Sequence, residues 1–462
     1  MPASVGRLMI DATSMHRYTD TTERVAQALL AYARDRLRLN PVPLDGPRSR
    51  EELEAEAGRT ITADGLGAPE ALRIFAQTLA PATVSVDNPR YLAFIPAAPT
   101  ELATLFDLVV GASSIYGGSW LEGAGAVYAE NEALRWLADL AGMPESAGGC
   151  FVSGGTIGNL SALVAARDAW RRSGERTGRP RVAATEQAHS SIDSSARVMD
   201  VEILRVPADE RGRLTGEALA AALEADGGDG VFAVATTAGT TNLGVVDDLA
   251  GVAAVCRERS LWMHVDGAYG AAALAAPSVR HLFAGIEHAD SFIVDPHKWL
   301  FGPFDCCALV YRDPEVARRA HTQHAGYLDA INNAGEWNPS DYGVHLSRRA
   351  RGLPFWFSLA MHGSDSYRDA IESTLQVARR GADEIRSRPY LELLVEPDLT
   401  VLTFKRVGWT AEDYAAWTQR LLDQGYAFVT PTTHNGEPCT RFAIINPRTT
   451  VSDLTGILAT MS

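Results

Sequence analysis

The chain has 462 residues, of which 46% are hydrophobic and 21% charged, so it has room for two or three domains of ordinary globular composition. Its formal net charge of −15, with no basic run, argues against nucleic acid and anionic membranes as partners. No apolar stretch approaches membrane-spanning length, and the first apolar segment is too short for a signal peptide. Five cysteines without metal-type spacing predict reduced thiols and no metal site. These features indicate a soluble cytoplasmic protein.

The first 85 residues predict a helical arm. Apolar and aromatic side chains recur at helical spacing from Thr21 to Arg36, behind a Thr and Glu start signal. A proline-rich interruption follows at residues 40–43. Because the arm has no obvious core of its own, we expect it to pack on a partner subunit.

Short apolar runs then alternate with helical patterns, which favours a mostly parallel sheet covered on both faces. The expected helices cover residues 159–172, 215–223 and 249–258. Such sheets bind ligands at the carboxyl ends of their strands. The expected strands are residues 150–153, 182–185, 202–206, 231–237, 261–265 and 291–294.

The pattern changes towards the C-terminus to that of a compact α+β end. We expect a small domain over residues 371–462, with a strand near 399–407 and a helix over 410–424. A single helix over residues 355–373 is predicted to link it to the preceding domain.

Residues 290–311 predict a strand, a tight turn and a returning strand, with Lys298 at the end of the first strand. Only two of the 42 basic residues are lysines, Lys298 and Lys405, and Lys405 lies in an apparent edge strand. A buried lysine is expensive unless its pKa is lowered so that it can form an imine. Lys298 is therefore the candidate for forming an imine. The alternative is a structural lysine whose side chain extends past the strand end so that its ammonium group reaches solvent.

Residues 151–159 place a glycine-rich turn between a strand and a helix. The free N–H groups and dipole of such a helix start attract a phosphate, and Thr156 adds a hydroxyl donor. Without a following lysine, the turn does not fit a nucleotide triphosphate site. A plain strand-to-helix turn is the alternative.

Polar residues follow three other expected strands: His189, Thr237 and Asp266. A buried aspartate needs a charged partner, although Asp266 could also cap a helix. A lone histidine such as His189 is more often structural than catalytic.

The motif of His297, Lys298 and Trp299 followed by Asp305 and Cys306 is similar to the lysine motif of group II pyridoxal-phosphate (PLP) amino-acid decarboxylases, a family that includes the aromatic-L-amino-acid decarboxylases. The SGGT turn and the HVDGAY string also resemble that family, best over residues 85–360. The resemblance implies the α/β PLP fold type I, like aspartate aminotransferase, usually in a homodimer. It divides the chain into a dimerisation arm (1–85), a large PLP-binding domain (86–370) and a small C-terminal domain (371–462).

The resemblance also implies roles for individual residues. Lys298 would carry PLP as a Schiff base, Asp266 would keep the pyridine nitrogen protonated, and His189 would stack on the ring and orient the substrate carboxylate. Asp295 stands where relatives often have asparagine and would need a partner such as an arginine. The residues implied in cofactor binding are Gly155, Thr156, His189, Thr237, Asp266, Ala268, His297 and Lys298.

Tyr342, in an expected mobile loop, matches the tyrosine that returns a proton to the substrate carbon, with Tyr327 as the alternative. The arginines at 348, 349 and 351 are expected on a basic helix after this loop. They make an acidic substrate a further candidate, with pairing to the protein's own carboxylates as the alternative. The implied substrate pocket favours an aromatic or bulky apolar side chain, although the sequence after Trp120 departs from the family pattern. Its expected lining residues are Tyr91, Phe94, Pro96 and Trp120.

The implied reaction is decarboxylation of an L-amino acid to an amine and CO2. Three alternatives use the same scaffold: oxidative deamination to an aldehyde with loss of CO2, another PLP reaction such as transamination or lyase chemistry, and a non-catalytic PLP-fold binding protein.

Overall fold

The computed structural model describes residues 14–174, 178–332 and 335–462, and these fold into two compact units that divide between Ser85 and Val86. The first unit contains α1 (Asp20–Leu37), α2 (Arg50–Ala57) and α3 (Ala68–Ile74). Capping boxes fix the starts of α1 and α2, and neither helix buries a residue completely. The helix expected over residues 21–36 is confirmed as α1.

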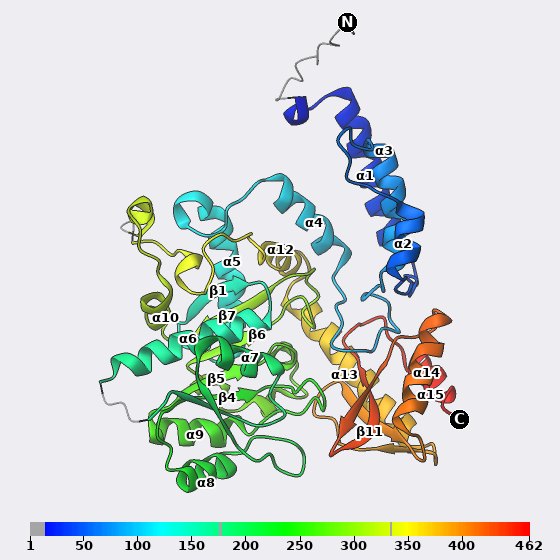
Figure 1. The fold of residues 1–462 in the computed structure, drawn as a ribbon. Coiled ribbons are helices and arrows are strands. Elements are labelled where there is room, and N and C mark those ends of the chain that lie inside the picture. The colour runs from blue at the N-terminus through cyan, green and yellow to red at the C-terminus, as the bar shows by residue number, and fades with distance from the viewer. Residues whose placement is uncertain (1–13, 175–177, 333–334) are drawn as a thin grey trace, which may run out of the picture. The chain divides into compact units, whose positions relative to one another are not determined.

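The second unit is built on a seven-stranded sheet with the order β1-β7-β6-β5-β4-β2-β3 (Figure 1). The neighbours from β6 to β3 run parallel, and β7 runs antiparallel to both β1 and β6. The strands are β1 (Gly148–Val152), β2 (Arg181–Ala184), β3 (Glu202–Arg205), β4 (Val231–Thr237), β5 (Trp262–Asp266), β6 (Ser291–Val294) and β7 (Cys307–Tyr311). The predicted α/β class with a mostly parallel sheet is confirmed.

Both faces of this sheet are buried, because successive side chains point to opposite sides. In β2, Ala183 belongs to the apolar core on one face, while Val182 and Ala184 belong to the core on the other. The flanking helices are α5 (Trp120–Leu140), α6 (Gly155–Arg172), α7 (Ser190–Met199), α8 (Gly216–Asp226), α9 (Leu249–Arg259) and α10 (Pro314–His321). The second unit also contains α4 (Glu101–Ala112) and the short α11 (Asp329–Asn332).

A second, antiparallel sheet forms near the C-terminus with the order β10-β11-β9-β8. Its strands are β8 (Leu391–Leu393), β9 (Val401–Arg406), β10 (Thr430–His434) and β11 (Glu437–Ala443). Phe404 and Phe442 pack on Trp417 of α14 (Ala411–Asp423) and on α15 (Val451–Ala459) to make a separate core.

The link to this sheet differs from the prediction of one helix over residues 355–373. The structure has two helices, α12 (Leu353–His362) and α13 (Ser364–Arg386). Gly363 separates them with φ of 78°, a left-handed conformation that glycine adopts without strain. The sequence prediction missed this break because it followed the apolar periodicity on both sides of the glycine.

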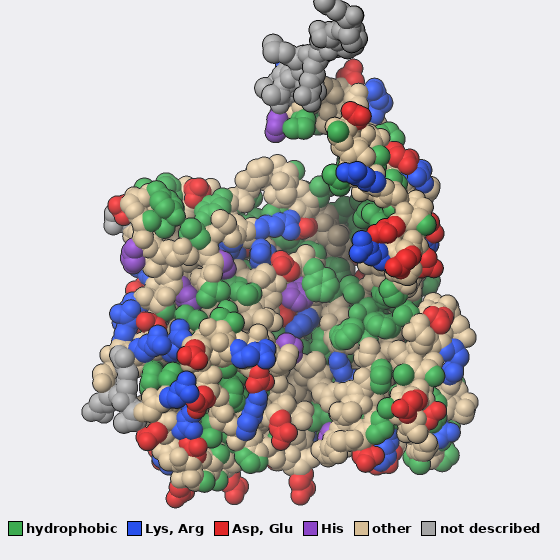
Figure 2. Space-filling model, in the orientation of Figure 1, with side chains coloured by type: hydrophobic (Ala, Val, Ile, Leu, Met, Phe, Trp, Pro, Cys, Tyr) green, Lys and Arg blue, Asp and Glu red, His purple; other side chains and the backbone are tan. Residues whose placement is uncertain are grey.

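Among the described residues, no helix combines the length and apolarity needed to cross a membrane. On the face drawn in Figure 2, basic and acidic side chains are interspersed rather than gathered into single-sign patches. This distribution agrees with the absence of a basic run from the sequence.

Candidate active site

A cavity of about 230 Å³ lies where β4, β5 and β6 end and α6 begins. This is the edge at which parallel sheets bind ligands. The eight residues proposed from the sequence to bind a cofactor all line this cavity: Gly155, Thr156, His189, Thr237, Asp266, Ala268, His297 and Lys298. The structure thus brings together residues that are spread over more than a hundred positions of the chain.

The glycine-rich turn forms the wall of the cavity at the start of α6. Gly154 is the N-cap and has no side chain to satisfy the first N–H groups of the helix. A Cβ atom at Gly155 would lie 3.2 Å from the Cβ atom of Ala268 and 3.3 Å from Asp295 Oδ2, so a larger residue would crowd the cavity. The uncapped N–H groups and the helix dipole make this wall suitable for a phosphate.

Asp266 ends β5 and is 5% exposed. Its Oδ1 accepts a hydrogen bond from the N–H of Ala268 at 3.1 Å, and its Oδ2 accepts one from Asn159 Nδ2 at 2.8 Å. Within the described part of the chain, no basic side chain lies at ion-pair distance from this carboxylate. A buried carboxylate of this kind is suited to a cationic ligand group such as a protonated pyridine nitrogen.

A hydrogen-bond network fixes the direction in which each group behind Asp266 donates. Asn159 Nδ2 donates to Asp266, so Asn159 Oδ1 accepts the Nε2–H of His264 at 2.8 Å. Trp262 Nε1–H donates to Ser291 Oγ at 2.9 Å. In a neutral imidazole with its proton on Nε2, Nδ1 accepts, so the Ser291 hydroxyl donates to His264 Nδ1 at 2.9 Å. Burial lowers the pKa of His264 to about 4, although Asp266 opposes the shift, so this imidazole is neutral.

The same network orients His189, the N-cap of α7. Asn159 Nδ2 also donates to Ser191 Oγ at 2.8 Å. The Ser191 hydroxyl donates to His189 Nδ1 at 2.8 Å, and the Ser191 N–H donates to the same atom at 3.2 Å. Because Nδ1 accepts twice, the ring proton is on Nε2, and Asn159 connects His189 with Asp266.

Lys298 follows β6 and forms an ion pair with Asp295, with 2.8 Å between Nζ and Oδ2. Burial alone would lower the pKa of Lys298, but the Asp295 carboxylate outweighs burial, and the pKa is raised above its ordinary value. The prediction that the pKa of Lys298 is lowered is therefore wrong. The partner of Asp295 is Lys298 rather than an arginine.

The aromatic residues expected around a substrate do not line this cavity. Tyr91 is buried against Phe428, with ring centroids 5.1 Å apart, whereas Phe94 is 56% exposed. Pro96 is buried in the loop before α4, and Trp120 begins α5. These four residues therefore do not line the cavity around Lys298.

The two candidate proton donors also lie elsewhere. Tyr342 is 3% exposed and stacks on Trp337, with ring centroids 4.2 Å apart. Burial raises the pKa of Tyr342 far above its ordinary value. Tyr327 is 76% exposed. Neither side chain lines the cavity around Lys298.

The arginines after Tyr342 lie in a loop before α12 and not on the predicted basic helix. The proline at position 354 stands in the first turn of α12, which places the helix start beyond them. Arg348 pairs with Glu130 and Arg349 with Asp107, while Arg351 approaches Asp305 at 3.6 Å. These arginines bind the protein's own carboxylates, which removes the argument for an acidic substrate.

The sequence prediction missed three candidate functional residues: Asn159, Tyr269 and Arg441. Asn159 and Tyr269 line the cavity directly. Arg441 of β11 is 6% exposed and donates to the carbonyl of Phe94 at 2.7 Å, and burial lowers its pKa to about 10. No carboxylate of the described residues lies within ion-pair distance of Arg441. The amide one turn into α6 was a visible signal for Asn159, but nothing local marked Arg441.

Known proteins agree with this geometry. Residues 68–407 match the family model described as the pyridoxal-dependent decarboxylase conserved domain. Aromatic-L-amino-acid decarboxylase of Bacillus atrophaeus is 29% identical over 434 residues, which cover 91% of this chain and 90% of that protein. Histidine decarboxylase of Mus musculus is 27% identical, over 82% of this chain and 60% of that protein. The crystal structure of Oryza sativa TDC with PLP and tryptamine superposes with a TM-score of 0.88 at 25% identity, covering 96% of this chain and 97% of that one.

The chain therefore belongs to the pyridoxal-dependent decarboxylases. Its fold is PLP fold type I, its cofactor is PLP, and its class of activity is that of a PLP-dependent carboxy-lyase. The cavity fits this cofactor, because it offers an uncapped helix start, a buried unpaired carboxylate and a lysine amine in one enclosure. The expected fold and cofactor are confirmed.

Proposed function

We propose that this protein decarboxylates an L-amino acid with an aromatic or bulky apolar side chain, giving the amine and CO2. The observation that carries the proposal is the convergence of Lys298, Asp266 and His189 on one cavity beside the start of α6. The similarity of this chain to an aromatic-L-amino-acid decarboxylase supports an aromatic side chain on the substrate. The likeness to a histidine decarboxylase makes an imidazole side chain the first competitor to test.

Each residue of the cavity has a distinct role in this proposal. The N–H groups at the start of α6, with Thr156, would hold the phosphate, and Lys298 would attach the cofactor covalently. Asp266 would accept a hydrogen bond from the protonated pyridine nitrogen. Held in this way, PLP would supply an electron sink for the electron pair left when CO2 departs.

His189 and Arg441 are the candidates for holding the substrate. The Nε2–H of His189 is free to donate into the cavity, because Nδ1 already accepts two hydrogen bonds. Arg441 is a buried cation near Tyr269, which lines the cavity, and it has no carboxylate partner among the described residues. A buried cation of this kind favours binding of the substrate carboxylate.

The last step distinguishes two products. Amine formation requires a proton on the carbon that loses CO2, and Tyr342, with Tyr327 as the alternative, stays the predicted donor. Since neither phenol lines the cavity, aldehyde formation is the second candidate. That reaction consumes O2 and water and releases CO2, ammonia, hydrogen peroxide and the aldehyde.

We also propose that the protein acts as a homodimer in the cytoplasm. Large apolar side chains lie exposed along α4 and α5, which suits a subunit interface: Leu102, Leu108, Val109, Leu121 and Tyr128. A second copy would supply further walls of the substrate pocket. The five free, buried cysteines are consistent with a reducing compartment.

A product assay with the PLP-loaded protein and a panel of L-amino acids tests the proposal. CO2, amine, aldehyde and peroxide are followed together, and equal amounts of CO2 and amine from an aromatic substrate are the expected result. Aldehyde with peroxide would replace the amine conclusion by the second candidate. No CO2 from any member of the panel would contradict the proposed reaction.

The lysine assignment has its own control within the chain. Lys298→Ala should abolish the imine absorbance of the bound cofactor and the activity, because the covalent attachment is lost. Lys405→Ala should leave both unchanged, since Lys405 pairs with Glu392 on β8. Loss of the imine in the second variant would overturn the assignment.

A further inference from the structure

Asp295 is a carboxylate in the wall of the cavity. The decarboxylation proposed above assigns it no role. Asp295 is 1% exposed, and its Oδ2 lies 2.8 Å from Lys298 Nζ and 3.5 Å from His297 Nε2. Its Oδ1 is buried and has no hydrogen-bond partner among the described residues. Asp295 also lines the cavity, so this acceptor belongs to the same site as Lys298.

The backbone holds Asp295 and Lys298 in a fixed relation. The N–H of Asp295 donates to the carbonyl of Ala268 at 3.0 Å, and the N–H of Lys298 donates to the carbonyl of Asp295 at 2.9 Å. The resulting turn presents both side chains to the cavity. Their pairing is therefore built into the loop after β6 and does not depend on a flexible surface contact.

The groups around this pair leave Lys298 as the main counter-charge of Asp295. His297 accepts the N–H of Cys306 at Nδ1, and burial lowers its pKa despite Asp295, so its ring is neutral. Cys307 is a buried thiol whose pKa burial raises well above the ordinary value. Asp266 is the other carboxylate that acts on Lys298, and the facing start of α6 contributes only glycines, Thr156 and Asn159.

We infer that Asp295 is a positioning residue for Lys298: it keeps the side-chain nitrogen positively charged and anchored at the floor of the cavity. Burial would raise the pKa of Asp295, but the charge of Lys298 lowers it, and the pKa of Lys298 moves upward, so both shifts agree with an ion pair. A lysine released from the cofactor then returns to Asp295 instead of ranging through the cavity. The inference rests on the proposed role of Lys298 as the cofactor lysine.

The first test follows the imine absorbance of the PLP-loaded, full-length protein as the pH is raised. Replacing the carboxylate by an isosteric amide, Asp295→Asn, removes the negative charge beside Nζ. We expect the midpoint of the absorbance change to fall by about one to three pH units, the effect of an opposite charge at this distance. An unchanged midpoint would overturn the inference, whereas absence of any imine at Lys298 would instead contradict the proposed function.

The second test needs no bound cofactor and uses the fact that the chain has only two lysines. Acylation of both is followed by peptide mass spectrometry on the full-length protein after cofactor removal. In the unsubstituted protein, the rate at Lys298 should still rise about tenfold per pH unit at pH 9, because the amine stays protonated there. A rate that levels off below pH 9 would overturn the inference without any variant.

Variants sharpen this second test. Asp295→Asn should raise the acylation rate of Lys298 at pH 8 by about tenfold for each unit of pKa lost, while the rate at Lys405 stays the same. The matched control is Glu392→Gln, which removes the carboxylate 3.2 Å from Lys405 Nζ and should leave Lys298 unaffected. Equal acceleration of both lysines in Asp295→Asn would indicate general loosening of the fold and contradict a specific pairing.

Discussion

Two buried ion pairs in the second unit have opposite surroundings. Arg348 and Glu130 form a two-pronged pair, with distances of 2.7 and 2.9 Å. Arg348 also donates to the carbonyls of Gly117 and Phe151, while Glu130 accepts the N–H of Gly352 at 2.8 Å. Lys298 and Asp295 instead share one contact, beside a cavity and with Asp295 Oδ1 unpartnered among the described residues.

The difference separates a structural pair from a functional one. Arg348 and Glu130 direct their hydrogen-bonding atoms to each other and to the backbone, with only Arg348 Nε unpartnered among the described residues. These bonds tie α5 to β1 and to the loop before α12. Their charges are therefore unavailable to a ligand. Lys298 keeps its remaining donor capacity directed to a cavity, which is the arrangement that a reacting amine requires.

The largest stability effect should come from breaking the structural pair. Glu130→Ala leaves the Arg348 guanidinium buried and the Gly352 N–H without its acceptor. We expect the free energy of unfolding to fall by about 3–5 kcal/mol, as for other broken buried pairs. Urea unfolding followed by circular dichroism measures the change.

A double variant distinguishes the loss of the pair from the loss of a charge. Glu130→Leu combined with Arg348→Met removes both charges and keeps an apolar filling, so it should recover most of the stability. If the double variant is as unstable as Glu130→Ala, the hydrogen bonds to the backbone matter more than the charge. A loss below about 1 kcal/mol in Glu130→Ala would place this pair among weak surface pairs instead.

Lowering the pH should reduce the free energy of unfolding by a smaller amount, because His264 in the network behind Asp266 is buried as a neutral ring. The folded protein holds His264 at a pKa of about 4 because it is buried, whereas an unfolded chain has an ordinary histidine pKa near 6.5. Between these values the unfolded state binds more protons, so stability falls as the pH is lowered from 6.5 towards 4. For His264 the loss approaches about 3 kcal/mol.

The variant His264→Gln tests this assignment, because glutamine can donate and accept in the network but does not titrate in this range. The unfolding free energy of the variant should depend less on pH between 6.5 and 4 than that of the unsubstituted protein. Burial also lowers the pKa of His345 to about 4 and that of His297 and His321 below the ordinary value, so part of the dependence should persist. An identical pH dependence in both proteins would exclude His264 as a contributor.

The sequence predicted the sheet well because its strands are marked locally. The expected ranges 231–237 and 291–294 are β4 and β6 without a shift, and the other four lie within two residues of the observed strands. Continuous apolar runs that end in glycine, proline or a polar residue carry this information in the chain itself. The eight cofactor candidates were implied by the resemblance to the decarboxylase family, and they meet at one edge because the carboxyl ends of parallel strands do.

The parts that the sequence could not reveal depend on contacts between distant segments. Tyr91 packs on Phe428, which belongs to a different part of the chain. The network from Trp262 to Asn159 requires β5, β6 and α6 to be placed first, and no local pattern encodes it. The counter-charge of Lys298 was three residues away, yet only the turn geometry shows that their side chains meet.

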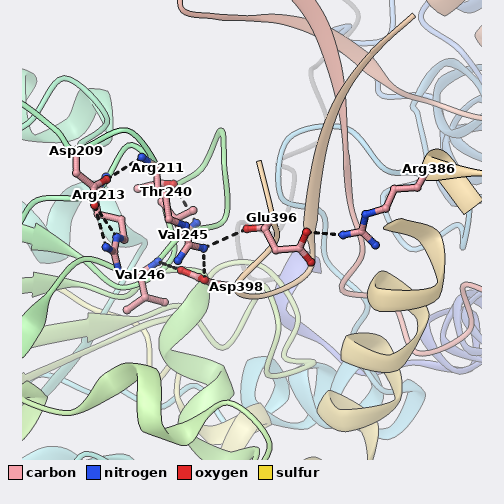
Figure 3. Close-up of polar contacts among 9 residues, drawn as sticks. All are labelled: Asp209, Arg211, Arg213, Thr240, Val245, Val246, Arg386, Glu396 and Asp398. Carbon is pink, nitrogen blue, oxygen red and sulfur yellow. Dashed lines mark hydrogen bonds and ion pairs between the residues drawn. The ribbon is translucent and has the colours of Figure 1, made fainter. Parts of the chain in front are cut away.

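The smallest effects should separate two neighbouring acidic residues in the loop before β9, drawn in Figure 3. Asp398 binds Arg211 at 2.6 Å and accepts the N–H of buried Val246 at 3.0 Å. The side chain of Glu396 forms an ion pair with Arg386. The Glu396 side chain is 69% exposed and that of Arg386 is 43% exposed. Asp398 therefore satisfies a buried backbone group, whereas Glu396 belongs to a surface ion pair.

Asp398→Ala should lower the free energy of unfolding by about 1–3 kcal/mol, because the Val246 N–H is left without an acceptor. Glu396→Ala should change it by less than about 1 kcal/mol, since solvent replaces an exposed carboxylate and its carbonyl contact with Arg211 remains. Urea unfolding of both variants in low and high salt measures the contrast. Equal losses that both shrink in high salt would mean that Asp398 acts only through its charge, and that the rule drawn from the two buried pairs does not extend to this loop.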